Sequence, residues 1–336
     1  MRSTLEPGGA APEVGPAEPR RRVDGRLVVL LVVVALYSRG TLRGSLDPVV
    51  LRTWTTVFVA IVVQALPFLA LGVLVSGAIT ALVSPAVLER ALPSSPLLAV
   101  PGAALAGAAL PGCECASVPI AGRLCARGVQ PAAAVAFMLA APAVNPVVLV
   151  ATAVAFPGQP RMVLARFLGS LGTSMLVGLL WSRVGGQAWV QRARDRLAAD
   201  DGPRWLAFTL AARHDLWDAG GWLVVGAAAA ATLQVVVPRS LLLAVADQPV
   251  LAVGALAGLA VVLAICSEAD AFVAASLREF SLTARLVFLV VGPAVDVKLI
   301  AMQAGLFGRR FAARFAPLTF VAAVVCALAA AQVVLR

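Results

Sequence analysis

The stretch from Pro111 to Pro119 places two thiols and a carboxylate inside an otherwise apolar region, with a proline at each end. Cys113 and Cys115 flank Glu114 in this stretch. Thiolates bind soft cations and metalloids, and a carboxylate in a membrane adds negative charge or carries a proton. Polar, non-helical backbone survives at membrane depth only where protein or a water-filled cavity surrounds it. We therefore expect this stretch to be unwound and to form part of a binding site.

A second polar stretch, in the latter half of the chain, carries Cys266, Glu268 and Asp270. Side chains two residues apart share a face on extended backbone. The two cysteines of the first stretch would then point one way, and so would the two carboxylates of the second. The predicted ligand is a soft or borderline cation or a trivalent metalloid compound. Its metal ligands would be Cys113, Cys115 and Glu268.

Two further breaks interrupt apolar runs at Pro142–Pro146 and Gly292–Lys298. Prolines in mid-run indicate broken or re-entrant helices. Lys298 is the only lysine among 27 basic residues, which indicates a need for a compact ammonium at that point. Asp296 either pairs with Lys298, or each side chain reaches a partner on another helix. Asn145 offers a neutral donor and acceptor at the equivalent place, so we expect all three to line a path for solute.

Each of these groups also has a purely structural interpretation. A buried cysteine often acts as a small hydrophobic residue. The carboxylates could lie in a solvated loop at the membrane interface, and Lys298 could extend from a helix end toward water. A carboxylate inside the bilayer, in contrast, costs about 2.5 kcal/mol or more and is a functional candidate by default. Cys125 and Cys326 have no acidic neighbour, and we expect them to be structural.

The composition defines the class of protein. Of the 336 residues, 61% are hydrophobic and 13% are charged, and long apolar runs recur along the chain. Runs of about 20 apolar residues predict membrane helices, so the predicted fold is an all-α polytopic membrane protein. The net charge of +10 fits arginine-rich loops on the cytoplasmic side better than a nucleic-acid partner. The single histidine, His214, excludes a histidine-based zinc site or catalytic pair within the membrane.

The organisation along the chain has four parts. Residues 1–22 are rich in proline, glycine and alanine and predict a disordered tail. Residues 23–183 form a first membrane repeat that includes an extra N-terminal helix. Residues 184–218 are a polar connector, placed on the cytoplasmic side by its arginines. Residues 219–336 form a second membrane repeat.

An offset of 151 residues aligns the two halves without a gap over residues 104–156 and 255–307. It pairs Cys115 with Cys266 and Pro142 with Pro293. Two related halves, each with a broken segment at the same place, are typical of secondary transporters, in which the broken segments meet near the midplane. The alternative is an old duplication retained for packing alone.

The sequence resembles a family of bacterial predicted permeases that are relatives of the organoarsenical-efflux (ArsP-type) permeases. The resemblance covers most of residues 54–336 and is carried by Cys113-Glu114-Cys115 with Val118-Pro119, by Gly128-Val129 through Ala136-Phe137 to Ala140-Ala141-Pro142-Ala143-Val144-Asn145-Pro146, and by Ser267-Glu268-Ala269-Asp270-Ala271-Phe272. It implies an inner-membrane permease with about eight to ten transmembrane helices. The arsenic-handling cysteines of the family would map onto Cys113 and Cys115. Other relatives are tied to metal homeostasis. The chain departs from the family pattern at Ala116-Ser117, where a small glycine is common.

The predicted function is that of a multi-pass permease of the inner (plasma) membrane, which moves a soft metal ion or a trivalent metalloid by alternating access. Its partners would be the lipid bilayer, the solute, and either a coupling proton or an accessory protein, with no nucleic acid and no cofactor. No Gly-x-x-x-x-Gly-Lys loop occurs in the sequence, so energy would come from a gradient or a partner ATPase. The alternatives are a permease for an unrelated small solute and a membrane-embedded thiol oxidoreductase, although the latter favours Cys-x-x-Cys spacing. An intramembrane aspartyl protease would need sequence settings around its aspartates that this chain lacks.

Overall fold

A computed structural model describes residues 48–82, 95–109, 114–185, 188–197, 204–236 and 248–336. Cys113, the predicted tail and the first apolar run at Leu27–Tyr37 lie outside the described residues. Predictions that concern them therefore stay predictions.

The described residues form helices joined by turns and contain no strand. The helices are α2 (Pro48–Leu82), α4 (Pro96–Ala109), α5 (Glu114–Ala126), α6 (Pro131–Ala140), α7 (Pro146–Ala155), α8 (Pro160–Val184), α9 (Ala188–Leu197), α10 (Arg204–Val236), α12 (Pro249–Leu263), α13 (Asp270–Ser276), α14 (Leu282–Ala294), α15 (Val297–Leu306) and α16 (Arg309–Val334). Many of them begin at proline, which lacks the N–H that would be unbonded in a first turn. The predicted all-α class is confirmed.

Four segments within the described ranges are long and apolar enough to cross a membrane, namely Val49–Ile79, Pro160–Val184, Leu282–Leu306 and Arg309–Val334. Shorter apolar helices accompany them. The protein is therefore a polytopic membrane protein. The Leu282–Leu306 segment, which comprises α14 and α15, is the most enclosed, because 83% of its apolar window is buried.

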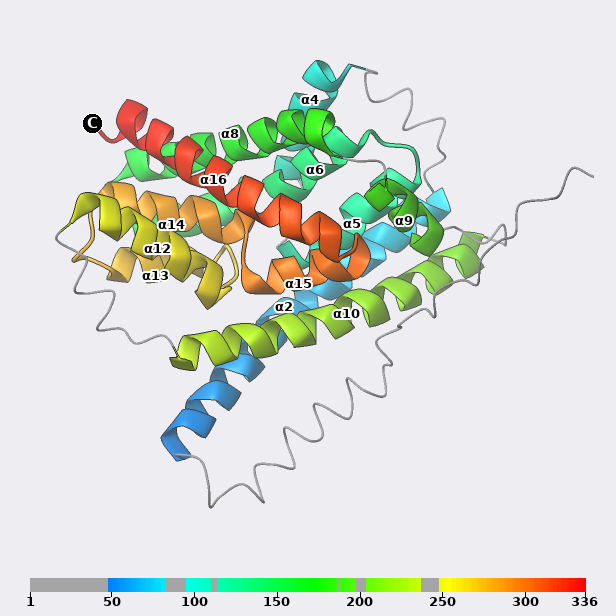
Figure 1. The fold of residues 1–336 in the computed structure, drawn as a ribbon, viewed down its shortest axis with the longest axis horizontal. Coiled ribbons are helices and arrows are strands. Elements are labelled where there is room, and N and C mark those ends of the chain that lie inside the picture. Colours follow the sequence, from blue (N-terminus) through cyan, green and yellow to red (C-terminus); the bar gives the residue numbers. More distant parts are fainter. Residues whose placement is uncertain (1–47, 83–94, 110–113, 186–187, 198–203, 237–247) are drawn as a thin grey trace, which may run out of the picture.

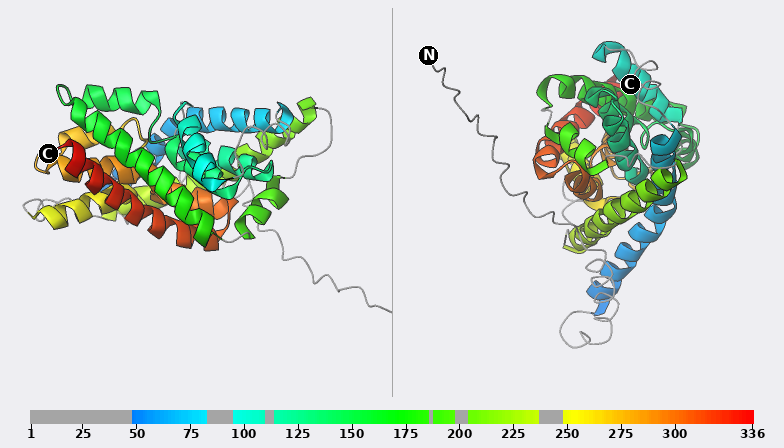
Figure 2. Two further views of the ribbon diagram at one scale, coloured as in Figure 1. Left: turned by 90° about the horizontal axis from the view of Figure 1, so that it is seen from above. Right: turned by 90° about the vertical axis from the view of Figure 1, so that its right-hand side faces the viewer.

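The helices pack in layers around this central pair (Figures 1 and 2). The long helices α2 and α10 lie side by side along one flank, and α8 packs against α16 on the other. The short helices α5 and α15 are enclosed between these flanks, where α2 and α10 contact α5 and α10 contacts α15. The interior therefore consists largely of short, broken helices held by long continuous ones.

Two glycines allow the long helices to approach the short ones closely. A Cβ atom on Gly72 of α2 would lie 2.5 Å from the Cα of Ala116 on α5. A Cβ atom on Gly226 of α10 would lie 2.6 Å from the Cα of Lys298 on α15. Real Cβ atoms do not come this close to backbone, so only glycine permits either contact. The helices α2 and α10 thus fix the positions of α5 and α15.

The helix breaks agree with the predictions from the sequence in three places and disagree with them in one. Residues 141–145 separate α6 from α7, and Val295 and Asp296 separate α14 from α15, as the prolines predict. Residues 264–269 are non-helical, although residues 267–269 form a turn and α13 begins at Asp270, so the backbone there is not simply extended.

The expectation of unwound backbone at Cys115 is wrong, because α5 begins at Glu114 and continues through Pro119. A carboxylate in the first turn favours a helix by interacting with the positive end of its dipole. Pro119 removes only the hydrogen bond that its own N–H would give to the carbonyl of Cys115. Tertiary packing on α5 outweighs that loss, since nearly every residue from Glu114 to Cys125 is buried.

The polar connector predicted at 184–218 contains the short helix α9 and the first half of α10. Helix α10 then continues without interruption into the apolar region up to Val236. The proposed boundary at residue 218 therefore falls within one helix.

Candidate functional site

The centre of the site is an ion pair between α5 and α15. The Nζ atom of Lys298 donates a hydrogen bond of 2.6 Å to Oε1 of Glu114, although 184 residues separate the two in sequence. Their side chains are each only 1% exposed. Buried charges are stable only when paired and hydrogen-bonded, so this pair must be present for α5 and α15 to pack as they do.

Two further oxygen atoms lie near the Lys298 ammonium. The carbonyl oxygen of Ala264, in the break after α12, lies 3.4 Å from Nζ and accepts a hydrogen bond from it. Oδ2 of Asp296 lies 3.8 Å from Nζ. The other carboxylate oxygen of Asp296 caps α15 by accepting a 2.6 Å hydrogen bond from the backbone N–H of Leu299. Three elements that are distant in sequence therefore supply oxygen atoms around one ammonium group.

Two thiols belong to the same region. Cys115 follows Glu114 in the first turn of α5, and Cys266 lies in the break that follows α12. Both are buried, and both are close enough to Lys298 to interact with its charge. The cysteines of the described residues are present as thiols rather than disulfides. The region thus combines carboxylates with soft sulfur groups.

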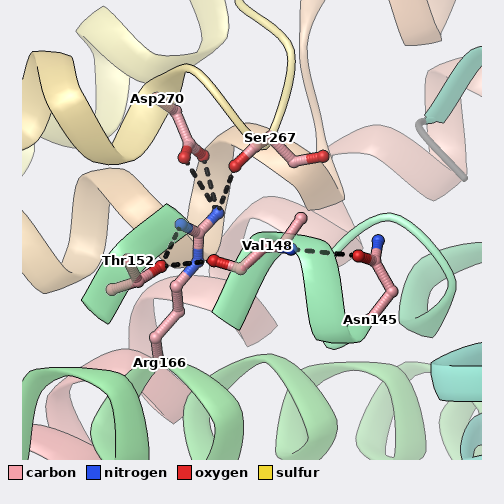
Figure 3. Close-up of polar contacts among 6 residues, drawn as sticks. All are labelled: Asn145, Val148, Thr152, Arg166, Ser267 and Asp270. Carbon is pink, nitrogen blue, oxygen red and sulfur yellow. Dashed lines mark hydrogen bonds and ion pairs between the residues drawn. The ribbon is translucent and has the colours of Figure 1, made fainter. Parts of the chain in front are cut away.

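A second buried cation, Arg166 on α8, joins the two halves of the chain (Figure 3). Its Nη2 atom lies 2.9 Å from each carboxylate oxygen of Asp270 and donates another 2.9 Å hydrogen bond to the carbonyl of Ser267. Its Nη1 atom donates to Oγ1 of Thr152 on α7 at 2.8 Å. The arginine therefore holds α7 and α8 against the turn that leads into α13.

Glu268 connects the two ion pairs. Its carboxylate is close enough to Glu114, Arg166 and Lys298 to interact with their charges. One of its oxygen atoms is buried with no hydrogen-bond partner among the described residues. The two ion pairs, Glu268 and Asp296 are therefore one cluster, in which four carboxylates accompany two cationic side chains within the described part of the chain.

Asn145 and Asp296 perform the same structural task in their respective halves. The Oδ1 atom of Asn145 accepts a 3.0 Å hydrogen bond from the N–H of Val148, which caps α7, and its Nδ2 atom donates to the carbonyl of Ala141. Each side chain bonds the backbone N–H three residues ahead, at the start of the helix that follows a break. These caps explain why a short polar side chain stands at both breaks.

A separate buried ion pair lies further along α5. Arg123 donates two hydrogen bonds, of 3.1 and 2.8 Å, to the two carboxylate oxygens of Asp215 on α10. The hydroxyl of Ser76 on α2 donates to the same carboxylate at 2.5 Å. A cavity of about 20 Å³, roughly large enough for one water molecule, adjoins Asp215 and is also lined by Val118 on α5 and Met302 on α15.

The structure brings together seven of the nine predicted site residues: Glu114, Cys115, Cys266, Glu268, Asp270, Asp296 and Lys298. Asn145 caps a neighbouring helix, and Cys113 lies outside the described residues. No three histidine, cysteine or acidic side chains are arranged to hold a metal ion in the ranges that the structure describes. The predicted metal ligands Cys113, Cys115 and Glu268 therefore stay a prediction.

Sequence reasoning missed Arg166, Arg123 and Asp215. Arg166 had a usable signal, since an arginine within the apolar run from Met162 to Trp181 is a functional candidate by default. Arg123 and Asp215 had no such signal in the sequence, because each stands near other charged residues, as is typical of a solvated loop. Only the packing of α2, α5 and α10 encloses that pair.

Enclosed charges beside broken helices are typical of permeases and other transporters. A profile of the ArsP_1 family, described as predicted permease, matches residues 50–332, and the chain belongs to this family. It is 36% identical over 287 residues to the UPF0718 protein YcgR of Bacillus subtilis, an alignment that covers 81% of this chain and 94% of that protein. It is 30% identical over 266 residues to a Streptococcus mutans protein named "Putative two-component membrane permease complex subunit". That alignment covers 77% of this chain and 88% of the Streptococcus protein. No solved structure matches the chain significantly.

Proposed function

We propose that the protein is a secondary permease of the inner (plasma) membrane that moves a soft metal ion or a trivalent metalloid compound by alternating access. Family membership establishes a membrane permease, and the substrate class is our extension of it. The observation that supports the proposal is the buried Glu114–Lys298 pair, because it joins α5 in the first part of the chain to the start of α15 in the second, close to two thiols. Solute sites of secondary transporters are built in this way.

The roles of the residues follow from their chemistry. Cys113 and Cys115 would bind the thiophilic solute together with Cys266, and Glu268 would complete a metal site. Glu114, Glu268 and Asp270 would balance its charge or carry coupling protons. Asn145, Asp296 and Lys298 would line the path.

The helix bounds support two repeats. Adding the sequence offset of 151 residues to the bounds of α7 gives those of α15. The same offset relates the capping residues Asn145 and Asp296. We propose that these halves move relative to one another, with the Arg166–Asp270 and Glu114–Lys298 contacts broken and remade as the site opens to each side.

Transport in membrane vesicles tests this proposal. Vesicles that contain the wild-type protein should move Zn²⁺, Cd²⁺ or trivalent methylarsenite faster than vesicles without it. Cys115→Ser should lower that rate at least ten-fold, whereas Cys326→Ser, a half-buried thiol on α16, should leave it unchanged. Equal rates for all variants and the empty vesicles would refute the proposal. A change in the thiol redox state of other membrane proteins, with no solute movement, would favour the oxidoreductase.

An accessory subunit is part of the proposal, because the name of the Streptococcus relative describes one member of a two-component complex. Vesicles from the native host would contain that subunit, and vesicles reconstituted from the purified chain would not. We expect transport in the former to exceed transport in the latter. Equal rates would mean that this chain acts alone.

A further inference from the structure

The Lys298 ammonium lies in a set of oxygen atoms that would suit a cation. Glu114 contributes a carboxylate oxygen at 2.6 Å, Ala264 a carbonyl at 3.4 Å and Asp296 a carboxylate oxygen at 3.8 Å. They come from the start of α5, the end of α12 and the start of α15. Carboxylate and carbonyl oxygens from separate elements, together with broken helix ends, are what coordinate ions in secondary transporters.

The backbone around Ala264 is arranged for this contact. Ala264 has φ 48° and ψ 41°, and it is the only non-glycine residue with positive φ among the described residues. Such a conformation is strained in a residue with a side chain and persists only where the surroundings impose it. It ends α12, and the carbonyl of Ala264 at this helix end accepts the hydrogen bond from Lys298. The negative end of the α12 dipole therefore meets the ammonium.

Lys298 does not satisfy the carboxylates that face it. Oε2 of Glu114 and Oδ2 of Asp296 are buried and have no hydrogen-bond partner within the described ranges. Buried polar atoms are rarely left unpaired. The unused oxygens indicate that the site can offer a ligand more coordination than one ammonium group needs.

We propose that the substrate of this site is a cation rather than a neutral metalloid, and that Lys298 is a tethered cation whose place on Glu114 and Asp296 the substrate takes. This inference rests on the proposed function and narrows its substrate class. A lysine suits the role because its ammonium is a compact point charge on a flexible stem, so it can swing away when another cation arrives.

Binding of Cd²⁺ to the purified full-length protein tests the inference, because binding can be measured whether or not transport occurs. Lys298→Gln removes the competing charge and should raise the Cd²⁺ affinity at least ten-fold. Lys298→Arg, the matched control at the same position, keeps the charge and should not raise it. Binding of neutral methylarsenite should change less than three-fold in either variant. An unchanged or weaker Cd²⁺ affinity in a folded Lys298→Gln protein would overturn the inference.

The wild-type protein provides a second test that needs no substitution. Lys298 is the only lysine, so a small amine reagent such as formaldehyde with cyanoborohydride can modify only this side chain and the N-terminus. Cd²⁺ should increase methylation of Lys298 at least three-fold, as read by mass spectrometry, because it displaces the ammonium from Glu114. Constant or reduced methylation would refute displacement. If vesicles show no transport while Cd²⁺ still exposes Lys298, the proposed function fails and the cation site stands.

Discussion

The Nη2 atom of Arg166 lies 2.9 Å from both carboxylate oxygens of Asp270, and its guanidinium is completely buried. The two residues are 104 positions apart, on α8 and at the start of α13. The guanidinium also bonds Ser267 and Thr152, so its loss would leave several polar groups buried without partners. This contact is one of two buried ion pairs that link the two halves of the chain, the other being Glu114–Lys298.

Breaking this pair should destabilise the protein strongly. Arg166→Gln leaves the Asp270 charge buried and unpaired, for which we expect a loss of about 3–5 kcal/mol. Arg161→Gln, an exposed position on the same helix, is the control. Thermal unfolding in detergent measures both. Adding Asp270→Asn to Arg166→Gln should recover part of the loss, because no lone charge then remains. Equal unfolding temperatures for the two single variants would contradict the assignment.

The two functions of Asp296 can be separated by substitution. Asp296→Asn keeps an oxygen atom that can accept from the N–H of Leu299 but removes the charge near Lys298. Asp296→Ala removes both. We expect Asp296→Ala to lose about 1 kcal/mol more stability than Asp296→Asn, since a lost N-cap typically costs that much. Transport should fall in both variants.

A melting series of the two variants, combined with vesicle transport, measures this difference. Asn145→Ala is the matched variant in the other half and should lose its cap on α7 in the same way. Equal stability of Asp296→Asn and Asp296→Ala would mean that the cap contributes little and that Asp296 acts only through its charge.

The sequence predicts the breaks in the fold well because prolines act locally. The break before α7 falls at Pro142 and Pro146. The break before α15 begins two residues after Pro293, which itself lies inside α14. The same reasoning fails at Pro119, where burial from several sides keeps α5 helical. A single proline removes one hydrogen bond, and only the tertiary structure decides whether that loss breaks the helix.

The composition of the cluster is predictable from sequence, but its pairings are not. Glu114 and Lys298 stand out as charges in apolar runs, yet nothing local to either indicates the other, 184 residues away. The repeat offset pairs Cys115 with Cys266 and brings the two stretches into correspondence, but it does not predict that Arg166 reaches Asp270. Long side chains choose their partners through the packing of whole helices, which the residue types alone do not specify.

Close packing of α10 on α15 should be sensitive to one methyl group. Gly226→Ala would place a Cβ atom 2.6 Å from the Cα of Lys298, so α10 must move away or Lys298 must shift. We expect a loss of about 1–3 kcal/mol, as is usual for overpacking, and a lower transport rate. Gly220→Ala on the same helix is the control, because its Cβ would meet only Leu69, at an ordinary 3.8 Å. Equal stability and equal transport rates of the two variants would show that the close contact between α10 and α15 does not matter for either property.

The Arg123–Asp215 pair should support the fold without setting the choice of solute. Arg123→Gln leaves the Asp215 carboxylate buried and should cost about 3–5 kcal/mol. Ser76→Ala removes one hydrogen bond to that carboxylate and should cost about 1.5–3 kcal/mol. His214→Gln alters a side chain that is 45% exposed and 3.7 Å from Asp215, so the loss should stay below about 1 kcal/mol.

Thermal unfolding of the three variants tests this order, and Cd²⁺ binding tests the separation of the two clusters. Arg123 lies more than two helical turns from Glu114 along α5, so its replacement should leave the Cd²⁺ affinity of the folded protein within three-fold of the wild type. A ten-fold change would mean that the two ion pairs act as one unit. The small cavity between Asp215, Val118 and Met302 would then be the physical connection, because it lies one turn from Glu114 on α5 and one turn from Lys298 on α15.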